Sequence, residues 1–308
     1  MVSPSAMVSV IIATNRDSPY LAAAVDSVCA QSHHDWELLI VDNGVPDRAA
    51  LDAVTARAPR SRVLHVPPPV TVSLARNTGA AAASGDLLVF LDDDDVWHPE
   101  RLERQVRALA DHPDAPASYC GGWHLDAAGV TIGDAWPATP ATALDMLTGG
   151  SRMPHICGAM MIRRSAFQEI GGFSPELTML EDFELAVRLL GRGEFVCVPN
   201  QLVGYRRHDR NATSTQLANV RVRREAMDRI LARHIWAADV RGDIVTARAL
   251  REHRSRERHR AAGEAGAATL TALRRRRFVI AAEETRWGIA RGPGAYLAHV
   301  ARRLTGAR

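Results

Sequence analysis

"LLVFLDDDDVWHPERL", residues 87–102, decides how this sequence folds. Residues 87–91 are apolar and rich in strand-forming side chains, which is typical of a buried β-strand. Four consecutive aspartates follow, although neighbouring carboxylates repel one another by about a few tenths of a kcal/mol or more per pair. Negative charge gathered at the end of a buried strand needs compensation, either from a cation or from the start of the helix expected after Pro99.

The preceding segments alternate between strand and helix. The expected strands cover residues 8–14, 36–41, 62–66 and 87–91, and the expected helices cover residues 20–31, 51–58 and 73–83. This alternation favours a doubly wound parallel sheet, in which ligands bind beyond the carboxyl ends of the strands. Thr14, Asp42 and the four aspartates lie at such ends.

Beyond residue 99 the pattern becomes mixed, and later it becomes helical. We expect, in order, a helix to about residue 110, short antiparallel strands over 116–135, an apolar strand over 156–163, a helix from about 181, and strands over 195–198 and 201–205. All 38 basic residues of the 308-residue chain are arginine. Of these, 17 precede residue 216 together with 26 acidic residues, whereas 21 follow it with 9 acidic residues. We therefore predict an acidic α/β domain over residues 1–215 and a basic helical region over residues 216–308.

Composition and cysteine usage favour a cytoplasmic globular protein. The chain is 46% hydrophobic and 24% charged, which is ordinary for a globular fold. Its four cysteines are scattered without a metal-binding spacing, so we expect reduced thiols. The N-terminus lacks the basic segment of a signal peptide, and no apolar stretch approaches the ~20 residues of a membrane-spanning helix.

The aspartate run has two interpretations. Mg²⁺ and Mn²⁺ prefer oxygen ligands and keep positions open for phosphate oxygens, so the run suits a metal–phosphate site. The alternative is a solvated acidic helix start around Asp95. Arg76 suits phosphate oxygens, although a surface arginine would show the same pattern. Asp42 suits hydrogen bonds from a nucleoside, or it is a plain turn residue.

Three further candidates lie late in the chain. Glu181 and Asp182 begin an expected helix, where the helix dipole alone would stabilise them. Their functional interpretation is a general base, which must reach the hydroxyl that it deprotonates. His208, in "GYRRHDRNATS", suits a phosphate or metal contact, or it is a solvated loop histidine.

Taken together, these segments resemble glycosyltransferase family 2, whose members use nucleotide sugars and have the GT-A fold. The resemblance covers roughly residues 7–215 and rests on motifs in the family's order: VSVIIAT, AVDSVCAQS, WELLIVDNG, ARNTGAAAASGDLLVFLDDDDVWHPERLERQ, GAMMIRRSAFQEIGGFSPEL, EDFELAVRL and YRRH. It implies an α/β protein with a GT-A type, Rossmann-like mixed sheet flanked by helices. A helical, arginine-rich C-terminal extension would follow.

The resemblance also implies where the nucleotide sugar binds. Thr14 and Asp42 would line the nucleoside pocket, and Asn15 stands where the family often has a base-stacking tyrosine. Arg76 would approach the nucleotide, and Arg206 would close over the diphosphate. The sequence departs from the family in this pocket, because ATNRD replaces the usual PTYNR and DNGV replaces DDGS.

The family's DxD motif falls on three of the four aspartates. Asp92 would face the ribose and take part in metal binding, and Asp93 would contact the nucleotide sugar. Asp94 would ligate Mn²⁺ or Mg²⁺ that bridges the diphosphate, and His208 would be a further metal contact. The resemblance therefore implies a divalent-metal cofactor.

The implied activity is a metal-dependent, inverting transfer of a sugar from a nucleoside-diphosphate donor, first of all a UDP-sugar, to a hydroxyl of a polysaccharide, glycolipid or natural product. Asp182 would be the base, with Glu181 as the second choice. Two alternatives stay open. A nucleotidyltransferase would want a glycine-rich first loop, which ATNRDSPY lacks. A non-catalytic nucleotide-sugar-binding scaffold would have lost the acids that are present here.

The arginine-rich region 216–308 carries no family motif. It suits packing on the acidic domain, a homodimer, or peripheral contact with an anionic membrane surface. Interspersed acids and the apolar residues Ile230, Leu231, Ile235 and Trp236 favour packing, so we do not expect nucleic-acid binding.

Overall fold

The computed structural model describes residues 3, 5–154, 156–209, 211 and 220–305, and it divides into two compact units. The first unit comprises Met1–Met146 and Arg152–Asn211. The second comprises Leu147–Ser151 and Ala212–Arg308. The predicted boundary between residues 215 and 216 lies outside the described residues.

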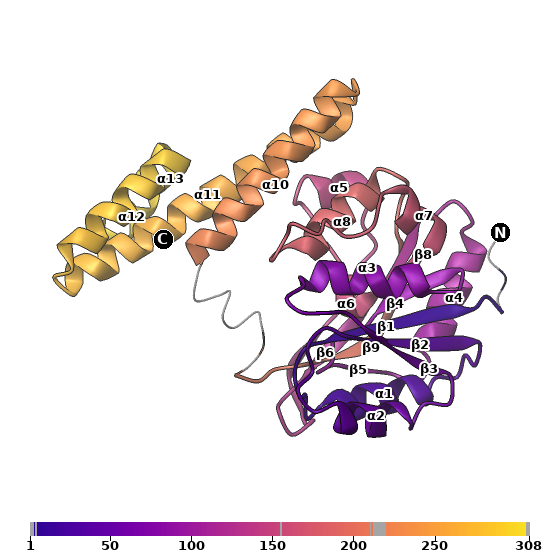
Figure 1. Ribbon diagram of the computed structural model, residues 1–308. Coiled ribbons are helices and arrows are strands. Elements are labelled where there is room, and N and C mark those ends of the chain that lie inside the picture. Colours follow the sequence, from indigo (N-terminus) through magenta and orange to yellow (C-terminus); the bar gives the residue numbers. More distant parts are fainter. Residues whose placement is uncertain (1–2, 4, 155, 210, 212–219, 306–308) are drawn as a thin grey trace. The chain divides into compact units, whose positions relative to one another are not determined.

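A nine-stranded mixed sheet forms the centre of the described part of the first unit (Figure 1). Its strands are β1 (Val8–Thr14), β2 (Trp36–Asp42), β3 (Ser61–His65), β4 (Leu87–Phe90), β5 (Val96–Trp97), β6 (Ala117–Leu125), β7 (Thr131–Trp136), β8 (Met160–Arg163) and β9 (Val196–Arg206). The order is β3-β2-β1-β4-β8-β6-β9-β5, and β7 pairs with β6. The first four strands are mutually parallel, as predicted, whereas β8 runs antiparallel to β4 and to β6. The predicted mixed α/β class is confirmed.

Helices cover both faces of this sheet (Figure 1). One face packs against α1 (Leu21–Cys29), α2 (Arg48–Thr55) and α4 (Arg101–Asp111), in a core that includes Val8, Val10 and Ile12 of β1. The helices of the other face and its rim are α3 (Val72–Ala82), α5 (Ala143–Leu147), α6 (Ile156–Ala159), α7 (Arg164–Glu169) and α8 (Glu181–Leu190). Helix α3 approaches the sheet so closely that a Cβ on Gly79 would lie 2.5 Å from Ile11 Cγ2. This close approach fixes α3, and with it Arg76, above the carboxyl ends of the strands.

Two sequence-based boundaries were wrong. Residues 156–163 were predicted as one strand, but 156–159 form the short α6 and only 160–163 form β8. Gly158 explains the difference, because its φ of 153° is a conformation that breaks a regular strand and that glycine adopts without penalty. The two late strands are in fact one strand, β9, whose register shifts opposite Cys120–Gly122 absorb the polar break between them.

The second unit is helical in its described residues. Its helices are α10 (Val220–Val240), α11 (Ile244–Arg274), α12 (Phe278–Arg291) and α13 (Pro293–Thr305). Small residues of α11 allow close packing against two aromatic side chains, in a core formed by Ala261, Ala262, Ala265, Trp287 and Tyr296. None of the helices in the described ranges combines the length and the apolar character that crossing a lipid bilayer requires.

Helix α10 packs as the sequence predicted, with one exception. Ile230, Leu231 and Ile235 are buried. Trp236, also predicted to pack, is 68% exposed. The reason is geometric: Ile235 lies at one edge of the buried face of α10, so Trp236, about 100° further round the helix, falls outside that face.

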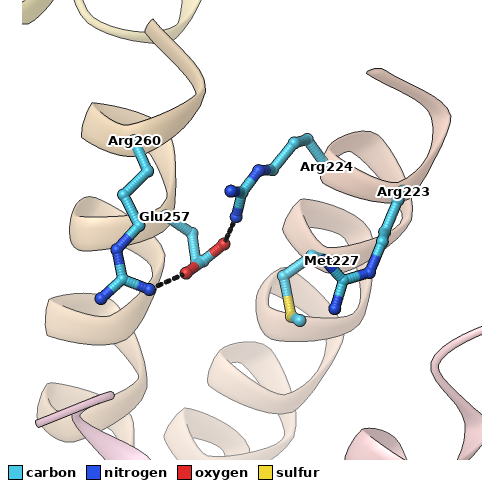
Figure 2. A pocket seen from close by; sticks show the side chains of 5 residues that line it. All are labelled: Arg223, Arg224, Met227, Glu257 and Arg260. Carbon is cyan, nitrogen blue, oxygen red and sulfur yellow. Dashed lines mark hydrogen bonds and ion pairs between the residues drawn. The ribbon is translucent and has the colours of Figure 1, made fainter. Parts of the chain in front are cut away.

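Ion pairs join α10 to α11. Figure 2 shows Glu257 between Arg224 and Arg260, and it makes an ion pair with each. Together with Arg223 and Met227 these residues line a cavity of about 200 Å³. Arg224 and Arg260 thus share a carboxylate partner of the same unit, which is how the unit accommodates part of its high arginine content.

Candidate active site

The aspartates after β4 form a turn at the carboxyl ends of the parallel strands. Asp93 accepts a hydrogen bond from the hydroxyl of Thr14, at the end of β1, over 2.6 Å. Arg16 lies between two carboxylates, with Nη2 2.6 Å from Asp93 Oδ1 and 2.8 Å from Asp94 Oδ2. The hydrogen bond to Asp93 raises the pKa of Arg16 against the opposing effect of burial. A guanidinium group therefore neutralises part of the acidic turn.

The fourth aspartate has a different role. Asp95 is fully buried, and its Oδ1 accepts the backbone N–H of Arg206 over 2.8 Å. Its Oδ2 has no hydrogen-bond partner among the described residues. Burial, together with the negative charge of Asp92 and Asp94, raises the pKa of Asp95 well above its usual value. A protonated Asp95 would relieve the repulsion that four adjacent carboxylates imply.

His208 meets the acidic turn from the loop after β9. Its Nε2 lies 3.1 Å from Asp94 Oδ2, and both side chains are buried. Asn211 holds the loop, because its side chain accepts from the His208 N–H and donates to the Arg206 carbonyl. The His208 ring stacks on the Tyr20 ring. The Arg206 guanidinium carbon lies 4.7 Å from the centroid of the same tyrosine ring. Arg206 Nε donates to the backbone carbonyl of Asp94 over 2.8 Å, so Arg206 stabilises the acidic turn.

A second cluster joins helix α3 to the start of α8. The buried Arg76 lies 2.8 Å from Asp92, 2.9 Å from Glu181 and 3.6 Å from Asp182. Burial alone would lower the pKa of Arg76, but the surrounding acidic groups outweigh it and raise that pKa. One arginine therefore links the acidic turn to both candidate bases.

The two candidate bases are held differently. Asp182 accepts from the backbone N–H of Cys157 over 3.2 Å and from its thiol over 3.1 Å, which orients the Asp182 carboxylate. Glu181 pairs with Arg76, and burial and the neighbouring Asp182 raise the pKa of Glu181. Both residues lie in the first turn of α8, which follows Leu180 in a left-handed conformation with a φ of 60°.

Besides Thr14, the predicted nucleoside-binding residues are Asn15, directly after β1, and Asp42, the last residue of β2. Asn15 is exposed at the end of β1. Asp42 is buried and accepts from the N–H groups of Gly44 and Val45, and its Oδ2 lies 2.9 Å from His65 Nδ1. Burial would raise the pKa of Asp42, but these donors outweigh it and lower that pKa. Both oxygens of Asp42 thus have local partners, as the turn interpretation expects.

A cavity of about 180 Å³ lies beside these residues. Its lining comes from the loop after β1, the loop after β2 and the adjoining helices α1 and α2: Arg16, Asp17, Ser18, Pro19, Leu21, Val45, Asp47, Ala50, Leu51 and Val54. Neither Thr14 nor Asp42 belongs to this lining among the described residues. Arg16 and Ser18 connect the cavity to the acidic turn, because Arg16 pairs with Asp93 and Asp94 and the Ser18 hydroxyl donates to the Asp93 carbonyl over 3.0 Å.

The acidic turn can be tested for its fit to a divalent cation. Asp94 Oδ2 and His208 Nε2 converge to 3.1 Å, so a carboxylate and an imidazole face one another. Within the described residues, no group of three or more His, Cys, Asp or Glu side chains is arranged to hold a metal. Mg²⁺ and Mn²⁺ bind through one or two protein ligands when phosphate oxygens and water complete their coordination. The pair Asp94 and His208 fits that mode of binding.

Three residues of these clusters were not identified from the sequence. Arg16 lies within the quoted ATNRD segment, two residues past a strand end, so its position was a usable signal. Tyr20 and Cys157 gave no signal of this kind. Their contacts with His208 and Asp182 join segments far apart in the chain.

Comparison with known proteins identifies the family. The family model for glycosyl transferase family 2 matches residues 9–171, just over half of the chain. An uncharacterized glycosyltransferase of Haemophilus influenzae is 26% identical over 201 residues, which cover 61% of this chain and 64% of that protein. The Escherichia coli protein WfgD, named as a UDP-Glc:alpha-D-GlcNAc-diphosphoundecaprenol beta-1,3-glucosyltransferase, is 31% identical over 103 residues, 33% of this chain and 41% of WfgD.

A solved structure has the same fold. TarS 1-349 of S. aureus, in complex with UDP-GlcNAc, superposes with a TM-score of 0.63 at 15% identity, covering 97% of this chain and 92% of TarS 1-349. The chain therefore belongs to glycosyl transferase family 2 and has the GT-A fold, as its sequence motifs implied.

Proposed function

We propose that this protein transfers a sugar from a nucleoside-diphosphate sugar to a hydroxyl group of an acceptor, with a UDP-sugar as the donor. Membership of the family supports the reaction class. The UDP-GlcNAc complex of TarS and the name of WfgD support the choice of nucleotide. The acceptor class, a polysaccharide, a glycolipid or a natural product, follows from the family resemblance alone.

One observation carries the proposal. Arg76 lies within 2.8–3.6 Å of Asp92 on one side and of Glu181 and Asp182 on the other. The acidic turn suits a metal–diphosphate, and the start of α8 supplies a base. The two halves of a glycosyl transfer, departure of the diphosphate and activation of the acceptor, are therefore adjacent.

The chemistry assigned to the chain's own residues is a single displacement. The acceptor oxygen forms a bond to the anomeric carbon, the bond from that carbon to the diphosphate oxygen breaks, and Asp182 takes the acceptor proton. A single displacement inverts the anomeric configuration. Arg76 and Arg16 are always charged, and each can donate to phosphate oxygens as negative charge develops on them.

A divalent ion, Mn²⁺ or Mg²⁺, forms part of the proposal. Asp94 and His208 would hold it, with Asp92 as a further predicted ligand. Such an ion would act as a Lewis acid on the departing diphosphate. Arg16 supplies positive charge to the same carboxylate, Asp94, over 2.8 Å.

Location and assembly belong to the same proposal. The four cysteines, Cys29, Cys120, Cys157 and Cys197, are free thiols, which agrees with the predicted cytoplasmic location. A peripheral membrane contact or a homodimer through the basic C-terminal region stays a prediction, as does the expectation that nucleic acid is not a partner.

A donor screen tests the function. UDP-, GDP- and dTDP-sugars would each be incubated with the protein and Mn²⁺, and release of nucleoside diphosphate and of inorganic pyrophosphate would be measured separately. We expect release of nucleoside diphosphate from the donor sugars of one nucleotide class. Asp182→Asn is the matched inactive control. Pyrophosphate release would instead identify a nucleotidyltransferase. Calorimetric binding of a nucleotide sugar without turnover, over a broad acceptor set, would identify a non-catalytic scaffold.

A further inference from the structure

Among the described residues of the second unit, the turn between α11 and α12 contains the longest run of consecutive exposed arginines. It comprises Leu273–Ile280, which we name the α11–α12 tip. Its four consecutive arginines, Arg274–Arg277, are all exposed. No acidic residue occurs in the chain from Leu273 until Glu283. In the described part of the chain none of the four makes an ion pair, unlike Arg224 or Arg258 of the same unit.

Large apolar side chains surround these arginines in the sequence and are themselves exposed. Leu273 is 44% exposed, Phe278 66%, Val279 74% and Ile280 43%. A soluble helix start normally presents polar residues at such positions. Contiguous exposed apolar surface beside concentrated charge is typical of an interaction surface.

The backbone of the tip supports the same conclusion. Arg276 has a φ of 55°, and the N–H groups of Arg276 and Arg277 bond to the carbonyls of Leu273 and Ala272. This is the Schellman motif, whose left-handed position normally holds glycine because a Cβ is unfavourable there. An arginine at this position is therefore a local cost to the fold.

We propose that the α11–α12 tip docks on an anionic lipid surface. The guanidinium groups of the tip can donate paired hydrogen bonds to lipid phosphates. Phe278, Val279 and Ile280 can insert at the boundary between headgroups and acyl chains. A nucleic acid or an acidic protein would satisfy the arginines and leave the three apolar side chains in water, so both charge and apolarity favour lipid. This surface goes beyond the proposed transfer reaction and does not depend on it.

Vesicle flotation of the full chain, without nucleotide, tests the tip. Vesicles of phosphatidylcholine alone would be compared with vesicles that also contain phosphatidylglycerol. Each arginine near an anionic surface contributes about a fivefold factor in partitioning, so Arg275→Gln/Arg277→Gln should weaken binding about 25-fold. Phe278→Ser/Val279→Ser should also weaken it.

The matched control, Arg256→Gln/Arg286→Gln, removes two exposed arginines outside the tip, one in α11 and one in α12, and the same net charge. We expect this variant to bind the anionic vesicles nearly as well as the parent, and high salt to release both. Absence of flotation by the parent protein, or an equal loss in the control, would overturn the proposal. Light scattering gives a further outcome that would overturn it. If the parent protein forms a dimer that the Phe278→Ser/Val279→Ser variant loses, and the parent does not bind vesicles, the tip is a self-association surface. Circular dichroism of each variant establishes that the helices are intact.

Discussion

Asp182→Asn is the substitution that most sharply tests how the acceptor is activated. Asparagine has nearly the same shape, and its carbonyl can still accept from the Cys157 N–H that lies 3.2 Å from Asp182. The fold and the acidic turn should therefore be unchanged. What the variant loses is the ability to take a proton, and general-base catalysis contributes roughly 10²–10⁴-fold. We expect the transfer rate to fall by that factor, which corresponds to about 3–5 kcal/mol in the activation free energy.

The assay is the initial rate of nucleoside-diphosphate release at saturating donor, with donor affinity measured separately by calorimetry. Donor affinity should stay within a few-fold of the parent value, because the nucleotide is assigned to the acidic turn. Glu181→Gln is the matched control, since it removes the neighbouring carboxylate and the Arg76 ion pair at 2.9 Å. We expect it to slow transfer by a smaller factor. A near-normal rate for Asp182→Asn with a collapse for Glu181→Gln would move the base to Glu181, and normal rates for both would refute the assignment to α8.

Three further substitutions probe the metal and the helical unit. Asp94→Ala should slow transfer by about 10²-fold or more, because it removes the carboxylate that faces His208 and would bind the metal. In calorimetry, Mn²⁺ should no longer strengthen nucleotide binding to this variant. Unchanged metal dependence would contradict this. Arg16→Ala should strengthen Mn²⁺ binding without nucleotide by about three- to tenfold in an EPR titration, since the competing guanidinium is removed; weaker Mn²⁺ binding would be inconsistent with it. Asp228→Asn should destabilise the second unit by about 1–2 kcal/mol at pH 7 in thermal unfolding, because Asp228 accepts from both Arg254 and Arg258. An unchanged melting temperature would exclude this contribution.

The pH dependence of this last pair of contacts has a definite sign. The two arginines lower the pKa of Asp228 below its usual 3.8 against the opposing effect of burial. A lowered pKa means that the stabilisation is present above pH 3.8 and is lost as the pH falls below it. The parent protein should therefore lose more stability between pH 5 and pH 3 than Asp228→Asn does. Equal losses in the two proteins would show that Asp228 is not responsible.

Local pattern predicted the first half of the sheet well, and for a physical reason. Buried parallel strands are continuous apolar runs, and β1, β2 and β4 are of that kind. Their carboxyl ends share one edge of the sheet, so Thr14 and the aspartates could be placed together before any coordinates. The antiparallel pairing of β8 between β4 and β6 depends on long-range contacts that no local pattern encodes.

For the candidate site, the sequence likewise indicated the individual residues but not the contacts between them. Asp94 and His208 were each identified, but their separation of 3.1 Å depends on a contact across 114 residues. The link from Arg76 to Glu181 spans 105 residues and was equally beyond reach of spacing. Trp236 was misplaced because periodicity gives the apolar face of a helix and does not determine how wide that face is. Arg16 follows β1 by two residues, but its partners Asp93 and Asp94 lie 77 and 78 residues further on, so only the parallel pairing of β1 with β4 brings them together.

An anomalous-difference map from crystals grown with UDP and Mn²⁺ would show whether Asp94 and His208 hold the metal. We expect a manganese peak within coordination distance of Asp94 and His208, with diphosphate oxygens on its open side and Arg16 moved off Asp94. Ordered UDP with no manganese peak at that pair, or with the peak elsewhere, would contradict it.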